Sequence, residues 1–416
     1  MKKQLVIIGN GLATMQLLKE LEYQQTYQVT VLSAENVPHY NRIMLSSLLA
    51  QETDLQSITP CDDAWYQARN IQVLLNHRVI NIDTSKQILS CENDREFKYD
   101  KLIFATGSRA FIPPMPGTEI PNVLEGVIGF RKLIDVDFMQ QVTRHYKKSV
   151  VIGAGLLGIE AAVGLAKQGM DVTLLHRRDV LMNRQIDQAA SDLLIKELTH
   201  RGIKIVTGFG PVGLTGEPIA ESDSHKVCAV ELDNGEAISA DLVVFATGII
   251  PCTPLAKASG LKVQKGICVD AQLKTSDDLI YALGECCEFE GNTYGLVAPI
   301  WNQARILAQQ LLLAPSDKMP VYNEEAFATK LKVSGIDVHS MGIINPNESE
   351  QECEVIEFND IERSIYKKII TSKQRVIGAV LYGDVVDSQW YFELLQQKRD
   401  ITEIRKNLIF GQAFCA

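Results

Sequence analysis

The sequence lacks the cysteine patterns that usually carry redox or metal chemistry. Its nine cysteines are scattered over 416 residues, none occurs before Cys61, and no Cys-x-x-Cys is present. An odd number without regular spacing argues against a disulfide framework. The missing Cys-x-x-Cys argues against a simple thiolate-ligated zinc or iron–sulfur site. No metal site is therefore expected.

The chain also lacks long apolar runs and an excess of positive charge. No run reaches the roughly 20 residues of a membrane-spanning helix. The apolar run behind Lys2 and Lys3 is too short for a signal peptide. A net charge of −10 argues against a nucleic-acid or anionic-lipid surface. We expect a cytoplasmic protein of two or three domains with no nucleic-acid or membrane partner.

The most informative stretch is a strand, a glycine loop and a helix near residue 150. The apolar run Val150–Ile152 enters a Gly-x-Gly-x-x-Gly loop formed by Gly153, Gly155 and Gly158, and a helical pattern follows over Ile159–Ala166. Such a turn directs free backbone N–H groups and a positive helix end at one spot, which binds pyrophosphate. The first glycine permits the turn, the second admits the phosphate, and the third lets helix and strand pack closely.

A second copy of this pattern opens the chain. The run Leu5–Ile8 enters Gly9-Asn10-Gly11, and a helical pattern follows over Leu12–Leu21. Thr14 stands where the third glycine is expected, so we expect this helix to lie slightly further from its strand. Glu35 follows Gly9 by 26 residues, where a carboxylate can accept the hydroxyls of an adenosine ribose. An exposed loop glutamate is the alternative.

The two halves share a third element. A strand that ends in Ala-Thr-Gly occurs at Asp100–Gly107 and again at Asp241–Gly248. The spacing from the first glycine of the loop to the glycine of this turn is 98 residues in the first half and 95 in the second. This internal repeat predicts two dinucleotide-binding domains and hence two dinucleotides.

The end of the second strand in the later half bears on coenzyme choice. That strand ends in His176-Arg177-Arg178-Asp179. An acidic residue there would favour NADH, whereas arginines can hold the 2′-phosphate of NADPH. A solvated basic turn is the alternative. We expect NADPH to be accepted and NADH to be usable, because exposed ion pairs contribute only about 1 kcal/mol or less.

The last third of the chain changes character. A strand within Leu273–Glu285 ends in Gly284-Glu285, where a carboxylate can accept a hydrogen bond from a flavin ribityl chain, although composition alone shows only a strand end. An amphipathic helix is expected near Trp301–Leu313. Beyond residue 320 no phosphate loop occurs. That part is expected to be an α+β module with strands at Lys330–Val333, Ile365–Ile370 and Val376–Tyr382 and a helix at Ser388–Lys398.

With these motifs the sequence resembles the two-dinucleotide FAD/NAD(P)H oxidoreductases of the glutathione-reductase structural type. Within them it is similar to the flavin module at the N-terminus of NAD(P)H nitrite reductase large subunits, to flavin subunits of assimilatory nitrate reductases, and to rubredoxin reductases. The matching segments are Gly9-Asn10-Gly11, Tyr40-Asn41-Arg42, Ala105-Thr106-Gly107-Ser108, Gly153–Glu160, Thr247-Gly248-Ile249, Tyr281–Cys286, Gly295–Pro299 and Gly378–Asp384.

The resemblance implies an α/β fold with two Rossmann-like dinucleotide-binding domains. Residues 1–112 and 250–319 would form an FAD domain, with an NAD(P)H domain of residues 113–249 inserted in it. Residues 320–416 would form an α+β interface domain through which a homodimer could assemble.

The resemblance also implies roles for two sets of residues. Residues implied to hold FAD are Gly9, Gly11, Leu12, Ala13, Glu35, Arg42, Ala105, Thr106, Gly107, Gly284 and Glu285. Residues expected to hold NAD(P)H are Gly153, Gly155, Leu156, Leu157, Gly158, His176, Arg177, Arg178 and Gly248. Glu160 would lie near the nicotinamide end as the catalytic residue.

One departure from the family narrows the expected function. Relatives that use a thiol place it where this chain has Leu45-Ser46-Ser47, and ferredoxin reductases of oxygenase systems carry a lysine at the Ser47 position. We therefore expect a flavoprotein that passes electrons from NAD(P)H to a partner redox protein without a thiol. The expected partner is a nitrate or nitrite reductase component; rubredoxin or ferredoxin is the alternative, and a flavin-bound sensor without turnover is a third reading.

Overall fold

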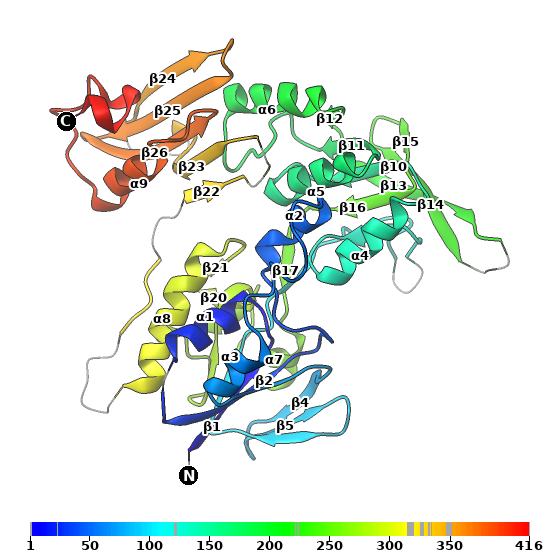
Figure 1. Cartoon of the computed structure of the whole chain (residues 1–416), viewed down its shortest axis with the longest axis vertical. Coiled ribbons are helices and arrows are strands. Elements are labelled where there is room, and N and C mark those ends of the chain that lie inside the picture. Colours follow the sequence, from blue (N-terminus) through cyan, green and yellow to red (C-terminus); the bar gives the residue numbers. More distant parts are fainter. Residues whose placement is uncertain are drawn as a thin grey trace. The chain divides into compact units, whose positions relative to one another are not determined.

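The chain divides into two compact units in a computed structural model (Figure 1). The first unit comprises Met1–Met44, Thr53–Arg109 and Ile249–Glu324, and the second Leu45–Glu52, Ala110–Gly248 and Glu325–Ala416. The residues that the structure describes are 2–22, 24–119, 123–220, 222, 224–313, 320–324, 328–331, 333, 335–346 and 352–415.

A five-stranded parallel sheet forms the core of the first unit, in the order β19-β7-β1-β2-β3. The central strand is buried from Leu5 to Ile8, which explains its continuous apolar run. The strands of this sheet are β1 (Lys3–Ile8), β2 (Tyr27–Leu32), β3 (Ile71–Leu74), β7 (Lys101–Phe104) and β19 (Ile280–Ala282).

Helix α1 (Leu12–Glu20) packs against α8 (Ala298–Leu312) in this unit (Figure 1). Two three-stranded sheets, β4-β5-β6 and β18-β20-β21, and one two-stranded pair, β17-β8, complete the strands. Their bounds, with the short helices, are η1 (Arg42–Met44), α3 (Asp63–Ala68), β4 (Val79–Asp83), β5 (Ile88–Cys91), β6 (Glu96–Lys98), β8 (Ser108–Ala110), β17 (Ile249–Pro251), α7 (Pro254–Ala258), β18 (Ile267–Val269), η2 (Gly284–Cys286), β20 (Cys287–Phe289) and β21 (Asn292–Thr293).

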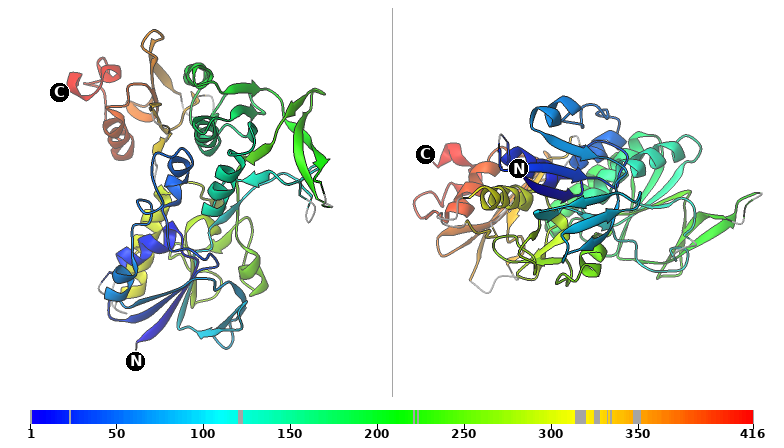
Figure 2. Two further views of the ribbon diagram at one scale, coloured as in Figure 1. Left: turned by 45° about the vertical axis from the view of Figure 1, so that its right-hand side comes forward. Right: turned by 90° about the horizontal axis from the view of Figure 1, so that it is seen from below.

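The second unit contains a parallel sheet of the same design, in the order β12-β11-β10-β16-β9. An antiparallel sheet, β13-β14-β15, adjoins it, and its long hairpin projects outward (Figure 2). The elements are α2 (Leu45–Leu49), β9 (Val127–Gly129), α4 (Leu133–Val142), β10 (Lys148–Ile152), α5 (Leu156–Lys167), β11 (Asp171–His176), α6 (Gln188–His200), β12 (Lys204–Thr207), β13 (Pro211–Pro218), β14 (His225–Leu232), β15 (Ala237–Ser239) and β16 (Leu242–Phe245).

The internal repeat appears in the structure as two nearly equal turns. Gly9 has a φ of +108°, and a Cβ on it would lie 2.3 Å from the carbonyl oxygen of Ala105. Gly153 has a φ of +107°, and a Cβ on it would lie 2.5 Å from the carbonyl oxygen of Ala246. Only glycine tolerates both the left-handed backbone and this approach. The predicted α/β fold with two Rossmann-like domains is confirmed.

The two copies differ at the third loop position. A Cβ on Gly158 would lie 1.7 Å from the carbonyl oxygen of Gly153, so α5 starts tightly against β10. In the first copy the Thr14 hydroxyl donates to the Gly9 carbonyl at 2.7 Å. Thr14 can therefore replace the third glycine, because its side chain forms a hydrogen bond with the loop at the place where helix and loop approach each other.

An antiparallel five-stranded sheet, β22-β23-β26-β25-β24, forms the C-terminal part of the second unit. One face packs on α9, and the last helical turns lie beside β24 and β25 (Figures 1 and 2). The elements are β22 (Ala328–Lys330), β23 (Val338–Gly342), β24 (Glu354–Asp360), β25 (Ile365–Ser372), β26 (Arg375–Tyr382), α9 (Ser388–Gln397), η4 (Leu408–Phe410) and η5 (Gln412–Phe414).

The other face of this sheet is fixed to α6. Asp187 caps α6 by accepting from the Ala190 N–H at 3.2 Å. Its other carboxylate oxygen accepts from the Tyr366 hydroxyl and the Lys368 ammonium, both at 2.8 Å. Lys368 is buried, so this ion pair compensates a charge that would otherwise be costly.

One strand prediction at the C-terminus differs from the structure, and two strands, β23 and β24, were not predicted. A strand occupies Ala328–Lys330 where Lys330–Val333 was expected, and Lys332 lies outside the described residues. Strand β24 was not predicted, because its exposed acidic positions lack the apolar alternation that marks a strand.

We predict that Gly158→Ala destabilises the protein by about 3 kcal/mol or more, because its Cβ would collide with a backbone carbonyl that cannot move away. Thermal unfolding followed by calorimetry measures this effect. Gly155→Ala is the matched control, since a Cβ there meets no atom within 4 Å. Equal melting temperatures for Gly158→Ala and the wild type would contradict the tight start of α5.

Candidate dinucleotide sites

Helices α1 and α5 begin in the same unusual way. Their N-cap residues, Gly11 and Gly155, offer no side-chain cap, and neither helix has an acidic residue in its first turn. The backbone N–H groups of the first turn therefore lack an intrahelical or side-chain acceptor. Both helix ends suit an anion such as a pyrophosphate. The predicted residues Leu12, Ala13, Leu156 and Leu157 all lie in these first turns.

The first loop leaves polar atoms without partners. Both polar atoms of the Asn10 side chain are buried and make no hydrogen bond within the described part of the chain. A Cβ on Gly11 would meet only Arg42 Nε, at 3.9 Å. The loop thus combines unmet hydrogen-bonding capacity with open space, which fits a bound dinucleotide.

Glu35 and Arg42, predicted to bind the dinucleotide, lie together. They form an ion pair, and the Tyr40 hydroxyl donates to the Glu35 carboxylate at 2.9 Å. The Arg42 guanidinium also lies over the Tyr40 ring, 4.8 Å from its centre. Each side chain is about one quarter exposed, at 25% for Glu35 and 23% for Arg42. The arrangement therefore leaves part of both groups open to a ligand.

His39 contacts the first dinucleotide loop, and it was not among the site residues predicted from the sequence. Its ring is buried, and Nδ1 lies 3.1 Å from the Asn10 carbonyl oxygen, which makes it a hydrogen-bond donor in the neutral ring. Burial lowers the pKa of His39 to about 4, and the Arg42 charge acts in the same direction. The only sequence signal was its position next to the Tyr-Asn-Arg segment.

The Ala-Thr-Gly turn of the first unit holds the returning chain. The Thr106 hydroxyl donates to the Cys252 carbonyl at 2.9 Å, and the Cys252 N–H donates to the Gly107 carbonyl at 2.9 Å. The neighbouring Ser108 hydroxyl donates to the Glu285 carboxylate at 2.8 Å. The structure therefore places Glu285 beside the Ala105–Gly107 turn, and the Thr106 hydroxyl is bonded to the backbone carbonyl of Cys252.

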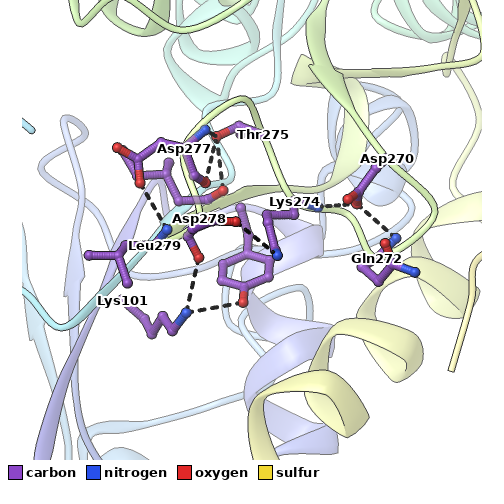
Figure 3. Close-up of polar contacts among 10 residues, drawn as sticks. Lys101, Asp270, Gln272, Lys274, Thr275, Asp277, Asp278 and Leu279 are labelled. Atoms are coloured by element: carbon purple, nitrogen blue, oxygen red, sulfur yellow. Dashed lines mark hydrogen bonds and ion pairs between the residues drawn. The ribbon is translucent and has the colours of Figure 1, made fainter. Parts of the chain in front are cut away.

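Hydrogen bonds within residues 270–279 and to Lys101 fix strand β19, which precedes the turn of Glu285 (Figure 3). Asp270 accepts the N–H groups of Gln272 and Lys274 at 2.8 and 2.9 Å. The Lys274 ammonium donates to Asp278 at 3.1 Å, and Lys101 on β7 donates to the Asp278 carbonyl at 3.1 Å. These contacts set the register of β19 beside β7 and so place the Gly284-Glu285 turn.

The second dinucleotide loop is open at two of its four predicted contact glycines. A Cβ on Gly155 or on Gly248 would meet no atom within 4 Å. Gly248 has a φ of +125°, and its carbonyl accepts from the Phe111 N–H at 2.9 Å. Space for a ligand therefore remains at the start of α5 and at the end of β16.

His176 is turned towards this loop. Its Nδ1 accepts from the Ala154 N–H at 3.2 Å. Burial lowers the pKa of His176, and the charge of Arg178 acts in the same direction. An Nδ1 that accepts a hydrogen bond carries no proton, so we expect any positive charge for a 2′-phosphate to come from Arg177 and Arg178. Both arginines are exposed.

Glu160 lines a pocket in the second unit together with Ser46, Ser47, Ala50 and Glu52. The serines lie on α2, which packs against α5 and α4. Hydrogen bonds join α2 to both helices, from the Gln168 amide to the Leu49 carbonyl and from the Gln140 amide to the Leu48 carbonyl. The pocket contains hydroxyl and carboxylate groups and no thiol among the residues that line it.

None of the nine cysteines, all of which lie in the described residues, forms a disulfide bond. The adjacent pair Cys286 and Cys287 is fully buried, and burial raises the pKa of both thiols. A protonated, buried thiol is a poor nucleophile. Burial therefore leaves neither thiol of this pair prepared for thiol chemistry.

Two uncapped helix ends, each behind a glycine loop on a five-stranded parallel sheet, define a protein that binds two dinucleotides. The chain belongs to the pyridine nucleotide-disulphide oxidoreductase family, and the sequence pattern of that family matches residues 3–306. The sequence pattern of the rubredoxin NAD+ reductase C-terminal domain matches residues 328–399. The chain is accordingly an oxidoreductase with FAD and NAD(P)H as cofactors.

Two curated relatives come from Bacillus subtilis strain 168. A nitrite reductase [NAD(P)H] is 40% identical over 407 residues, which cover 97% of this chain and 48% of that protein. An assimilatory nitrate reductase electron transfer subunit is 37% identical over 412 residues, which cover 98% of this chain and 51% of that protein. The chain thus spans about half the length of these relatives.

Solved structures share the whole fold. The covalent putidaredoxin reductase–putidaredoxin complex matches with a TM-score of 0.84 and 24% identity, covering 99% of this chain and 96% of that chain. In the described residues, no helix is long and apolar enough to cross a membrane. No group of three or more potential metal ligands was found in that same part of the chain.

We predict that acid destabilises the wild type through His39. Its pKa is about 4 in the folded chain and 6.5 ordinarily, so the unfolded chain binds a proton that the folded chain excludes between these values. Stability is therefore lost as the pH falls from about 6.5 to 4, by up to about 3 kcal/mol. Urea unfolding at several pH values measures this loss.

His39→Gln should flatten this pH dependence, because glutamine does not titrate. His200→Gln, at an exposed position at the end of α6, is the control and should keep the wild-type slope. The same slope in His39→Gln and the wild type would show that other groups cause the acid effect.

Proposed function

We propose that this chain passes electrons from NAD(P)H through FAD to a partner redox protein, a component of a nitrate or nitrite reductase. The observation that carries the proposal is the pair of open dinucleotide loops combined with a pocket at Glu160 that holds serines instead of a thiol. The names of the two B. subtilis relatives support the choice of acceptor.

The proposed FAD domain comprises residues 1–112 and 250–319. Its loop glycines Gly9 and Gly11 and the first turn of α1 would hold the pyrophosphate. Glu35 would accept from the adenosine ribose, with Arg42 beside it. The Ala105–Gly107 turn and the Gly284-Glu285 turn would hold the flavin half. The orphaned Asn10 amide supports a ligand at this loop.

The proposed NAD(P)H domain comprises residues 113–249, with residues 320–416 as the interface domain. Gly153, Gly155, Gly158 and the first turn of α5 would hold the coenzyme pyrophosphate, and Gly248 would border it. Glu160, four residues behind the start of α5, would lie near the nicotinamide end. Assembly of two copies through the interface domain stays a prediction.

FAD supplies the redox chemistry, since it accepts two electrons with a hydride and can release them one at a time. The residues of the chain bind and orient the two dinucleotides, and this step requires no general acid or base. Ser46 and Ser47 offer no thiol to store electrons. The acceptor must therefore receive electrons directly, which favours a protein partner.

A rubredoxin or ferredoxin as acceptor is the second candidate. It is favoured by the match of residues 328–399 to a rubredoxin reductase domain. We also propose a cytoplasmic location, supported by nine cysteines that form no disulfide bond, as is usual in reducing compartments.

The acceptor is tested by anaerobic reduction of the purified protein with NAD(P)H, followed by addition of a rubredoxin, a ferredoxin or a purified nitrate or nitrite reductase. Rapid flavin reoxidation by the nitrate or nitrite reductase, and slower reoxidation by the small carriers, is the expected result. Fast reoxidation by rubredoxin alone would select the second candidate. A flavin that NAD(P)H does not bleach would exclude both.

We predict that Arg177→Ala/Arg178→Ala raises the KM for NADPH about five- to tenfold, because two exposed guanidinium groups contribute about 1 kcal/mol to phosphate binding. The KM for NADH should stay within about twofold. Steady-state kinetics with a dye acceptor measures both constants. Arg144→Ala, at another exposed arginine of the same unit, is the control. Equal effects on both coenzymes would identify the pair as a solvated turn.

A further inference from the structure

The turn that carries Glu285 depends on a close approach between two elements. Gly284 has a φ of +81°, and a Cβ on it would lie 2.9 Å from the Cβ of Ala13 on α1. The turn therefore lies directly against the helix that starts at the first dinucleotide loop. Any movement of Gly284 changes where Glu285 points relative to that loop.

Both polar groups of Gly284 are held by buried side chains. Its N–H donates to Gln303 Oε1 at 2.7 Å, and its carbonyl accepts from the Cys287 thiol at 3.2 Å. Gln303 and Cys287 are both completely buried. We refer to these two side chains as the Gly284 clamp.

The Gln303 amide is oriented by its oxygen, because Oε1 accepts from the Gly284 N–H. Its NH₂ group is buried and makes no hydrogen bond within the described part of the chain. Burial raises the pKa of the Cys287 thiol, so this thiol keeps the proton that it donates to the Gly284 carbonyl. The contact with Gly284 therefore sets how the Gln303 side chain lies.

We propose that Gln303 and Cys287 are positioning residues for FAD: they fix the Gly284 peptide so that Glu285 is aimed at the flavin half of the bound cofactor. The proposal rests on the assignment of Glu285 to FAD made above. On the other side, Glu285 is held by the Ser108 hydroxyl. The carboxylate is thus oriented from both ends before the cofactor binds, which reduces the ordering that binding requires.

A purely structural role would have a different signature. A buried glutamine that only fills the core would stabilise the protein equally with and without FAD. A positioning glutamine would mainly change the stability that FAD adds to the protein. When Gln303 is replaced, the Gly284 N–H loses its acceptor, and the turn can move away from the geometry that binds FAD. The dissociation constant of FAD separates the two roles.

The test compares Gln303→Met, Gln303→Glu and wild type after removal of the flavin. FAD binding is followed by quenching of flavin fluorescence, and thermal unfolding is measured for the apoprotein and the FAD complex. Gln303→Met keeps the side-chain length but loses the acceptor, and its dissociation constant should rise about tenfold. Gln303→Glu retains an oxygen at the same place and should recover most of the affinity.

Gln309→Met, at an exposed position on the same helix, is the matched control and should bind FAD as the wild type does. If Gln303→Met does not fold, Cys287→Ala and Cys287→Ser test the other half of the clamp. The alanine variant should bind FAD about threefold more weakly, and serine, which can still donate to Gly284, should not.

An unchanged FAD dissociation constant in Gln303→Met or Cys287→Ala, with equal loss of stability in apoprotein and complex, overturns the proposal. Glu285→Gln is measured alongside. If that variant binds FAD as tightly as wild type, the assignment of Glu285 fails together with the clamp. If Glu285→Gln weakens binding and the clamp variants do not, only the clamp proposal fails.

Discussion

The structure depends on one steric constraint, the absence of a side chain at the first glycine of each dinucleotide loop. At Gly9 and Gly153 the carbonyl oxygen of the neighbouring strand occupies the place where a Cβ would be. This approach lets the first strand pair closely with the Ala-Thr-Gly strand up to its last residue. The helix behind the loop then starts at the carboxyl edge of the sheet, where its free N–H groups face a ligand. Sheet order, helix position and open binding space all follow from it.

The elements that repeat could be predicted because their signals are local. A glycine loop demands its own backbone geometry, and a buried parallel strand demands an apolar run, so Leu5–Ile8 and Val150–Ile152 identified both sheets. His39 and Gln303 could not be predicted in this way. Their partners, Asn10 and Gly284, lie 29 and 19 residues away, and only the fold brings each pair together. A single histidine or a helical glutamine has no sequence signal for such a contact.

In the C-terminal sheet, buried charged residues limit what the apolar pattern of the sequence can predict. Strands β25 and β26 were predicted within two residues of their ends. In β25 the consecutive residues Lys367 and Lys368 point to opposite faces, and both are buried. Each is matched by a carboxylate from elsewhere, Asp384 at 2.7 Å and Asp187 at 2.8 Å. Two charged residues in a strand therefore indicate ion pairs with other parts of the chain, and the pair of Lys368 with Asp187 ties the sheet to α6.

The family takes its name from disulphide chemistry, yet the pocket beside Glu160 in this chain is lined by serines and by no cysteine. The segment Leu45–Glu52 belongs to the second unit and presents Ser46 and Ser47 beside Glu160. The four buried cysteines have raised pKa values because of burial, so none of these four is prepared to act as a nucleophile. In the function proposed above, electrons would pass from the flavin directly to the acceptor, and surface complementarity would then select that acceptor.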